Sequence, residues 1–433
     1  MPETGSEPAV DIAPTAHEVA RVQRRTVWVL SGGQVLGGLA FGATLSLGAV
    51  LAAELSGEDA FSGLAVAAVT FGTALTAVPL AAIARRRGRR LSLTTGMAVA
   101  LIGVGLVIFA VALRSFPVLL AGFLIIGSGQ AANLQSRFAA ADLATDASRG
   151  RDLSIVVWAT TVGAVLGPNL TGPGELIGGA IGMPPLTGAY LFTIVAQGLA
   201  IVLYLVAMRP DPLLLAQRVV ASAKAASRTI AKADRPVAAR YAIFAVAAAH
   251  GTMVSVMAMT PVHLAHLTHG ATEAATLSII GLTISLHIAG MYVLSPVFGI
   301  LADKVGRVPT ILVGQALLAA ALLTASFGQA STTAVTVALV LLGLGWSAST
   351  VAGSTLLTES SSEELRTRRQ GISDFTMSIV GGVGAITAGA LLGWIGYGGL
   401  ALVVMVLVAA SVVLSPLGWR ASTARAPEAA SGA

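Results

Sequence analysis

Long apolar stretches alternate along the whole chain with short polar segments, many of them basic. Each stretch holds about 20 mostly apolar residues, the length that a helix needs to cross a hydrocarbon core about 30 Å thick. The pattern therefore predicts an all-α membrane protein with twelve transmembrane helices. The predicted spans are 27–52, 61–84, 91–113, 117–140, 153–173, 187–208, 241–265, 275–301, 309–328, 333–357, 371–395 and 398–418.

A basic segment at 209–240 divides the helices into two blocks of six. It opens with Arg209-Pro210-Asp211-Pro212 and carries 7 Lys and Arg against two Asp, which is typical of a helix lying on a membrane leaflet. The first residues of the chain contain no apolar core of their own, so we expect a tail rather than a signal peptide. The predicted organisation is a tail at 1–26, a first half at 27–208, the linker at 209–240, a second half at 241–418 and a tail at 419–433.

Composition and charge agree with this class. The chain is 55% hydrophobic and 11% charged, whereas soluble domains carry roughly 25% charged residues. All 26 Lys and Arg residues except Arg114 and Arg137 fall on one side of the predicted bundle. The positive-inside rule places that side and both termini in the cytoplasm. We expect the protein in the plasma membrane. The net charge of +6 is thus explained by topology, with the lipid bilayer as partner and no nucleic acid.

Five of the six histidines and four of the ten methionines lie between His250 and Met291. On the seventh predicted helix, His250, Met253 and Met257 share one stripe, and on the eighth His287 and Met291 are four residues apart. Imidazole and thioether groups suit Cu(I). At about 1.5 Å per residue, Met253 and His287 lie near mid-membrane, where an ionisable side chain is a functional candidate. Packing in an apolar core is the alternative for the methionines.

Three more histidines, His263, His266 and His269, follow at three-residue spacing beyond the seventh helix. In a helical turn they would share a face and could capture a metal ion before it reaches the interior. An exposed polar loop is the alternative.

The run Gly299-Ile300-Leu301-Ala302-Asp303-Lys304-Val305-Gly306-Arg307 resembles the loop motif G-x-L-A-D-x-x-G-R of the major facilitator superfamily. With twelve helices in a 6+6 division, the chain is identified as a member of that superfamily. The resemblance implies a secondary transporter with two pseudo-symmetric halves, a substrate site near the midplane and alternating access. It also implies that Asp303 caps a neighbouring helix end and pairs with arginines, which steadies one access state. Arg85 holds the acidic position in the first half, so we expect that latch to be altered or missing there.

The fifth predicted helix contains Gly163, Gly167, Pro168 and Gly172 in a run that resembles the superfamily's antiporter motif, G-x-x-x-G-P-x-x-G-G. One interpretation is a packing and hinge motif, because small residues permit close helix contact and proline bends a helix. The other is a proton-coupled exporter of drugs or small molecules. Against the exporter, Phe123 stands where proton-coupled relatives carry an arginine.

The MxxxM spacing of Met253 and Met257 and the HxxxM spacing of His287 and Met291 are similar to the paired motifs of the CcoA-like (CalT) copper importers, a branch of this superfamily. This resemblance implies copper uptake through these four residues, with His250 nearby. Copper is then a transported substrate, and no cofactor is expected. The alternative remains a proton-coupled drug or small-molecule exporter.

Arg137 and Asp374 lie near the cytoplasmic ends of the fourth and eleventh helices, which face each other in this superfamily. One interpretation is that they form an inner gate pair, and the alternative is that each lies separately in the headgroup region. The absence of a catalytic triad, a phosphate loop and a buried carboxylate pair argues against an enzyme. We expect a monomer, and zero cysteines exclude disulfides and thiol chemistry.

Overall fold

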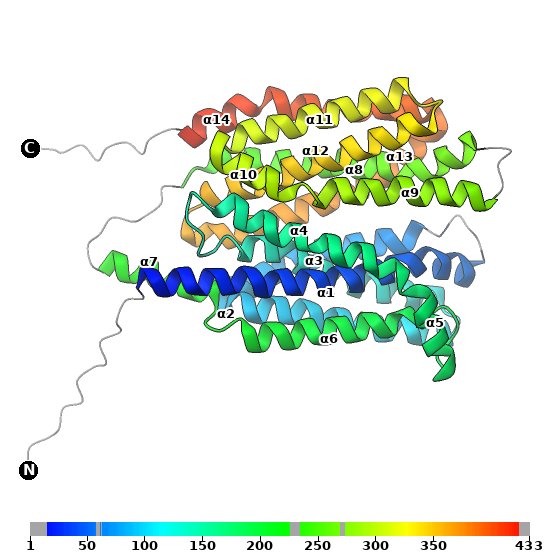
Figure 1. Ribbon diagram of the computed structural model, residues 1–433, viewed down its shortest axis with the longest axis horizontal. Helices are drawn as coiled ribbons and strands as arrows, with labels where there is room; N and C mark the ends of the chain where they lie inside the picture. The colour runs from blue at the N-terminus through cyan, green and yellow to red at the C-terminus, as the bar shows by residue number, and fades with distance from the viewer. Residues whose placement is uncertain (1–14, 58–60, 62, 226–233, 269–272, 424–433) are drawn as a thin grey trace, which may run out of the picture.

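Two groups of helices run side by side along the long axis of the molecule (Figure 1). The computed structural model describes residues 15–57, 61, 63–225, 234–268 and 273–423, and no strand occurs among them. The first half consists of α1 Ala16–Ser56, α2 Gly63–Ala112, α3 Phe116–Ala139, α4 Arg149–Asn169, α5 Thr171–Ala180 and α6 Ala189–Ala207. The second half consists of α8 Pro236–Leu267, α9 Glu273–Tyr292, α10 Ser295–Val305, α11 Arg307–Phe327, α12 Thr332–Glu359, α13 Glu363–Val413 and α14 Ser415–Thr423.

The two longest helices each contain a hairpin at a glycine. In α2, Gly88 has φ +87°, and in α13, Gly396 has φ +72°, values that favour glycine because it lacks a Cβ. The hydroxyl of Ser92 donates to the carbonyl of Leu80 at 2.7 Å, which shows that α2 folds back on itself. Each of these helices therefore supplies two membrane spans.

Eight helices are long and apolar enough to cross a membrane, or nine if the bent pair α4 and α5 counts as one span, among the residues that the structure describes. Two of the eight contain the hairpins, and α1 adds a helix of 41 residues that packs along α4 and α6. Together these elements confirm the predicted all-α architecture of twelve spans in two halves.

Two predicted spans contain a break beside a proline. The predicted helix at 153–173 ends at Asn169, directly after Pro168, and α5 continues at a bend of 60°. The predicted helix at 275–301 is divided into α9 and α10, with Pro296 at the start of α10. A proline has no amide hydrogen and cannot continue the hydrogen bonding of the preceding turn.

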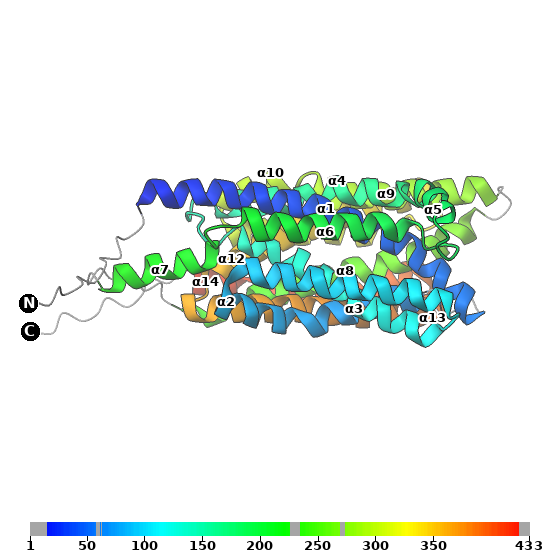
Figure 2. The same cartoon turned by 90° about the horizontal axis from the view of Figure 1, so that it is seen from below.

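α1 begins and α14 ends at the same end of the bundle (Figure 1). This end also carries the arginine-rich segments 85–90, 149–151 and 366–369, and we call it the basic end. The linker forms α7, Pro212–Ala225, which extends outward from the basic end (Figures 1 and 2). Leu213 and Leu215 of α7 are buried, so its first turns pack against the bundle.

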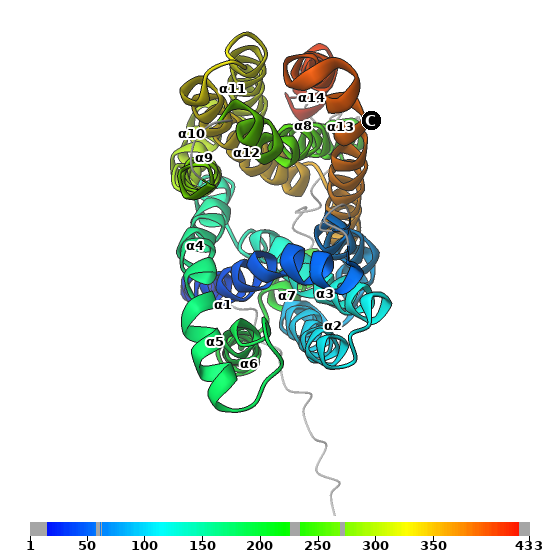
Figure 3. The same ribbon diagram turned by 90° about the vertical axis from the view of Figure 1, so that its right-hand side faces the viewer.

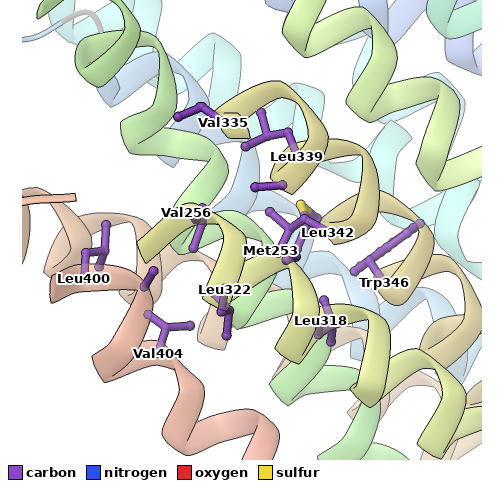
Figure 4. Close-up of a cluster of buried hydrophobic side chains, with 14 of the residues drawn as sticks. Met253, Val256, Leu318, Leu322, Val335, Leu339, Leu342, Trp346, Leu400 and Val404 are labelled. Carbon is purple, nitrogen blue, oxygen red and sulfur yellow. The ribbon is translucent and has the colours of Figure 1, made fainter. Parts of the chain in front are cut away.

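The two halves meet along two pairs of elements, α2 with α13 and α4 with α9 and α10 (Figure 3). Each half has its own apolar core. The core of the second half joins α8, α11, α12 and α13 (Figure 4), and its members include Met253, Leu318, Leu342 and Trp346. A smaller cluster at the basic end crosses between the halves, since Phe138 of α3 packs with Ala245 of α8 and Leu356 of α12.

Candidate functional site

The loop motif of the second half fastens the two halves at the basic end. Asp303 accepts hydrogen bonds from the backbone amides of Gly150 at 3.0 Å and Arg151 at 2.9 Å, at the start of α4. A carboxylate at a helix N-terminus satisfies amides that lack helical partners and interacts favourably with the helix dipole. Arg307 pairs with Asp303 at 3.0 Å and with Glu359 at 2.7 Å. The geometry is that expected of Asp303 as a cap linking one half to the other.

Gly299 and Gly306 of this motif occupy positions where a side chain would clash or strain the backbone. A Cβ on Gly299 would come within 2.6 Å of the backbone carbonyl of Gly150, so Gly299 permits the close contact of α10 with α4. Gly306 has φ +114°, a conformation that L side chains rarely adopt. The first turn of α11 therefore starts where Arg307 can reach Glu359.

The first half carries an altered version of this latch. Arg85 is exposed at the acidic position. Arg89, which follows Gly88 in the hairpin loop of α2, is fully buried and pairs with Asp142 at 2.8 Å. It also donates to Gln370 of α13 at 2.6 Å, so this arginine again connects the halves. Gly88 and Arg89 thus correspond to Gly306 and Arg307, as duplicated halves predict.

Arg137 of α3 and Asp374 of α13 form a buried ion pair between the halves. Their side chains are 3% and 0% exposed, and the Arg137 Nη2 to Asp374 Oδ1 distance is 2.5 Å. Asp374 Oδ2 and Arg137 Nε are buried with no hydrogen-bond partner among the described residues. Each charge therefore depends mainly on the other, and the structure brings together the two residues that the sequence suggested as a pair.

Three rings from three helices of the second half form a cluster, which we call the ring cluster: His250, Tyr292 and Trp346. Trp346 Nε1 donates to His250 Nδ1 at 3.1 Å. The Tyr292 and Trp346 rings meet edge to face with centroids 5.9 Å apart. Trp346 is buried, whereas His250 and Tyr292 are half-buried. The buried Trp346 therefore holds the more exposed rings of His250 and Tyr292 in place.

The ring cluster lies at one depth in the second half, and Tyr292 is its member that faces the first half. His250, Tyr292 and Trp346 are each about 20 Å along their helices from the basic end, which is mid-membrane. Tyr292 packs against the cluster of Leu153 and Val157 from α4 of the first half. His250 and Tyr292 both lie within electrostatic range of Arg137. The ion pair of Arg137 therefore lies on the basic-end side of the rings.

The predicted metal ligands lie in or beside one apolar core of the second half, because His287 and His250 bond to its members Leu339 and Trp346. Met253 and Met291 are buried in the same apolar core, and Met257 packs against it. His287 is fully buried, and its Nδ1 donates to the carbonyl of Leu339 in α12 at 2.7 Å. α12 packs extensively against both α8 and α9, which touch each other little, so the seventh and eighth spans are not direct neighbours. His250 turns away toward Trp346.

His263 and His266 are not in a loop, because α8 continues to Leu267. His263 stacks on Tyr397 with a centroid distance of 4.2 Å, and its Nε2 bonds the carbonyl of Gln329 at 2.7 Å. His266 is exposed, and His269 lies outside the described residues. Among the described residues, no group of three or more His, Cys, Asp or Glu side chains converges as a metal site.

The motif on α4 makes a close contact with α1. A Cβ on Gly163 would come within 2.5 Å of the Leu39 amide and 2.8 Å of the Gly38 carbonyl carbon. Gly167 is buried, whereas a Cβ on Gly172, in α5, would meet no atom within 4 Å among the described residues. The bend follows Pro168, so the arrangement has the features of a packing and hinge motif.

Sequence reasoning missed Tyr292, Trp346, Arg89 and Gln370. An aromatic residue in an apolar helix usually packs in the core, so Tyr292 and Trp346 could not be recognised from the sequence as part of a binding site. The available signal for Arg89 was the internal repeat, because it matches Arg307 when the two hairpin loops are aligned. Its partner Gln370 could not be found without the fold.

Comparison with known proteins identifies the class. The Major Facilitator Superfamily profile matches residues 30–279 and 266–432, so the chain belongs to this superfamily. It is a multi-pass membrane protein and a secondary transporter rather than an enzyme, and it acts on a small substrate by the alternating access general to these proteins.

Individual relatives cover most of the chain. It is 35% identical to the MFS-type transporter YddS of Bacillus subtilis over 85% of each chain. It is 27% identical to the riboflavin transporter RfnT of Brucella anthropi, over 92% of this chain and 98% of that one. Among solved structures, the human organic anion transporter MFSD10 superposes with a TM-score of 0.69 at 18% identity, covering 91% of this chain and 99% of that one.

Proposed function

We propose that this transporter carries a ring-bearing organic small molecule, which binds between the halves at the ring cluster. The observation that carries the proposal is that His250, Tyr292 and Trp346 form a ring cluster at mid-membrane depth, with His250 and Tyr292 within electrostatic range of Arg137. Aromatic side chains stack on flat ligands, and a nearby guanidinium attracts carbonyl or anionic oxygens. Apolar walls with a few polar groups are typical of small-molecule sites.

A relative with a named cargo supports this choice of substrate class. RfnT, 27% identical, is named as a riboflavin transporter. Riboflavin has a flat heteroaromatic ring system with carbonyl oxygens, so it has the chemistry that the ring cluster and Arg137 would bind. The likeness to RfnT supports an organic cargo, as in the alternative of the sequence analysis, a proton-coupled drug or small-molecule exporter, over metal ions.

The proposed orientation puts the basic end in the cytoplasm. Of the Lys and Arg residues that the structure describes, all but Arg114 and the buried Arg137 belong to segments at that end, and basic loops face the cytoplasm in membrane proteins. Both termini then lie in the cytoplasm, and the protein is located in the plasma membrane. The state described by the structure is closed on the cytoplasmic side, because the hydrogen bonds of Arg89, Asp303 and Arg137 join the halves there.

The direct test is exchange in proteoliposomes. Vesicles with the purified chain, loaded with unlabelled riboflavin, are expected to accumulate labelled riboflavin faster than protein-free vesicles. Exchange is independent of the physiological direction of transport, so import and export both give a signal. Competition by a panel of flat ring compounds measures how broad the cargo class is. Failure of riboflavin and of every ring compound in the panel would contradict the proposal.

Copper uptake is the second candidate, and one specific observation favours it. His287 donates through Nδ1 to a backbone carbonyl, which leaves the Nε2 lone pair available, and Nε2 is buried without a partner among the described residues. Metal-binding histidines commonly donate their other nitrogen to a carbonyl in this way. Met253 and Met291, in the adjoining core, would supply thioether ligands for Cu(I).

The copper candidate predicts that His287→Leu and the double variant Met253→Leu with Met291→Leu lose copper accumulation by cells at matched protein levels. Leucine approximately conserves the volume of methionine, so the fold should tolerate it. The matched control is Met259→Leu, a neighbouring methionine outside the predicted ligands. Copper accumulation no greater than in cells with an empty vector would remove this candidate and leave the organic cargo unaffected.

A further inference from the structure

A cavity at the basic end of the first half is lined by four arginines. It has a volume of about 320 Å³ and lies between the hairpin loop of α2 and the start of α7. Its lining residues are Arg87, Arg90, Arg209, Pro210, Asp211, Leu214, Leu215 and Arg218. We call it the arginine cavity, and it is far from the ring cluster.

The single carboxylate in this cavity does not neutralise the arginines. Asp211 Oδ1 accepts from the amides of Leu213 at 3.0 Å and Leu214 at 3.2 Å, and Oδ2 accepts from the Arg90 amide at 2.7 Å. The carboxylate therefore caps α7 and fastens it to the hairpin loop. No ion pair involves the guanidinium groups of Arg87, Arg90 or Arg218 within the described part of the chain, so the cavity keeps a strong positive charge.

The position of the arginine cavity matches the headgroup level of a membrane. α6 has 19 residues and spans about 28 Å, nearly the full hydrocarbon thickness, and Arg209 follows its last turn. Leu199, Val202 and Val206 form an exposed apolar stripe on α6 that leads toward Arg209. The cavity itself combines guanidinium groups with the apolar side chains of Leu214 and Leu215. A ligand with an anionic head and an apolar tail fits this arrangement.

We propose that the arginine cavity binds the phosphodiester headgroup of an anionic phospholipid, with the acyl chains along α6. Arginine binds phosphate through paired N–H donors, and basic pockets at the cytoplasmic ends of membrane helices attract anionic lipid heads. The bound lipid would hold the hairpin loop against α7. Because Arg89 lies in that loop and bonds Asp142 and Gln370, lipid binding stabilises the state that is closed at the basic end.

The test is native mass spectrometry of the purified full chain in a neutral detergent, titrated with phosphatidylglycerol, phosphatidylcholine or inorganic phosphate. The lining variant is Arg87→Gln with Arg218→Gln. The matched control is Arg85→Gln with Arg86→Gln, which removes two exposed arginines from the same loop outside the cavity. Each basic residue near an anionic headgroup contributes roughly a factor of five, so the lining variant is expected to bind phosphatidylglycerol about 30-fold more weakly.

Three results would overturn the proposal. An equal loss of phosphatidylglycerol binding in the lining and control variants would indicate diffuse attraction to positive charge rather than a defined site. Equal binding of phosphatidylcholine and phosphatidylglycerol would show that the anionic head is not recognised. Binding of inorganic phosphate as tight as that of phosphatidylglycerol would assign the cavity to a soluble anion. The proposed lipid site is supported if only the lining variant loses binding, and if it loses binding only of phosphatidylglycerol.

Discussion

Arg137→Ala is expected to abolish transport and to open the basic end of the protein. The substitution leaves Asp374 buried without its partner, and breaking a buried ion pair on one side costs about 3–5 kcal/mol. That energy is large enough to shift the balance between the two access states by roughly 150- to 5,000-fold. Asp374→Asn leaves the arginine unpaired and should act in the same direction.

Opening can be measured with a thiol probe because the natural chain has no cysteine. Ala245→Cys places one thiol in the apolar cluster that crosses between the halves, where Ala245 is fully buried. A membrane-impermeant maleimide applied at the basic end should label this cysteine slowly in the otherwise natural chain. Adding Arg137→Ala should accelerate labelling strongly.

Two double variants distinguish a gate from a general structural role. The charge reversal Arg137→Asp with Asp374→Arg should recover part of the transport lost in the single variants. Arg137→Met with Asp374→Leu should keep the basic end closed, since apolar replacement of a buried pair is often neutral for stability, yet transport should stay low. Transport at the natural rate in the Arg137→Ala variant would refute the role of this pair.

The architecture could be predicted well from the sequence, because a helix that spans a membrane must be long and apolar. Twelve spans and two halves follow from the lengths of apolar runs, whereas the cap formed by Asp303 was expected only from the resemblance to a family motif, because its partners Gly150 and Arg151 are far away in sequence. The breaks in the spans after Pro168 and before Pro296 were predictable in principle, since proline cannot donate a backbone hydrogen bond. Only the first of these prolines was predicted to bend its helix.

The site was harder to predict, because the order of helices in space differs from their order in the chain. His287 and Met253 lie on consecutive spans at similar depth, but α12 packs between α8 and α9. Periodicity shows which residues share one helix face and cannot show which helix that face meets. The ring cluster depends on one ring from each of three helices, so no pattern within one helix could reveal it.

Tyr292→Leu is expected to weaken binding of a flat ring-bearing cargo by roughly 5- to 150-fold, because stacking of a ring on an aromatic side chain contributes about 1–3 kcal/mol. The side chain is half-buried at the contact between the halves, and its ring meets Trp346 edge to face. Tyr292→Phe keeps the ring and should bind nearly as well as the natural chain. Equilibrium binding of riboflavin, followed by its fluorescence in detergent solution, measures the difference.

Trp394→Leu is the matched control, because it also removes an aromatic ring but at a position 88% exposed on the outer surface. Its riboflavin affinity should equal that of the natural chain. Equal weakening by Tyr292→Leu and Trp394→Leu would point to a general effect on the fold, and unchanged binding in Tyr292→Leu would place the cargo elsewhere. If Tyr292→Phe is as weak as Tyr292→Leu, the hydroxyl rather than the ring binds the cargo, and recognition would then rest on hydrogen bonding at mid-membrane.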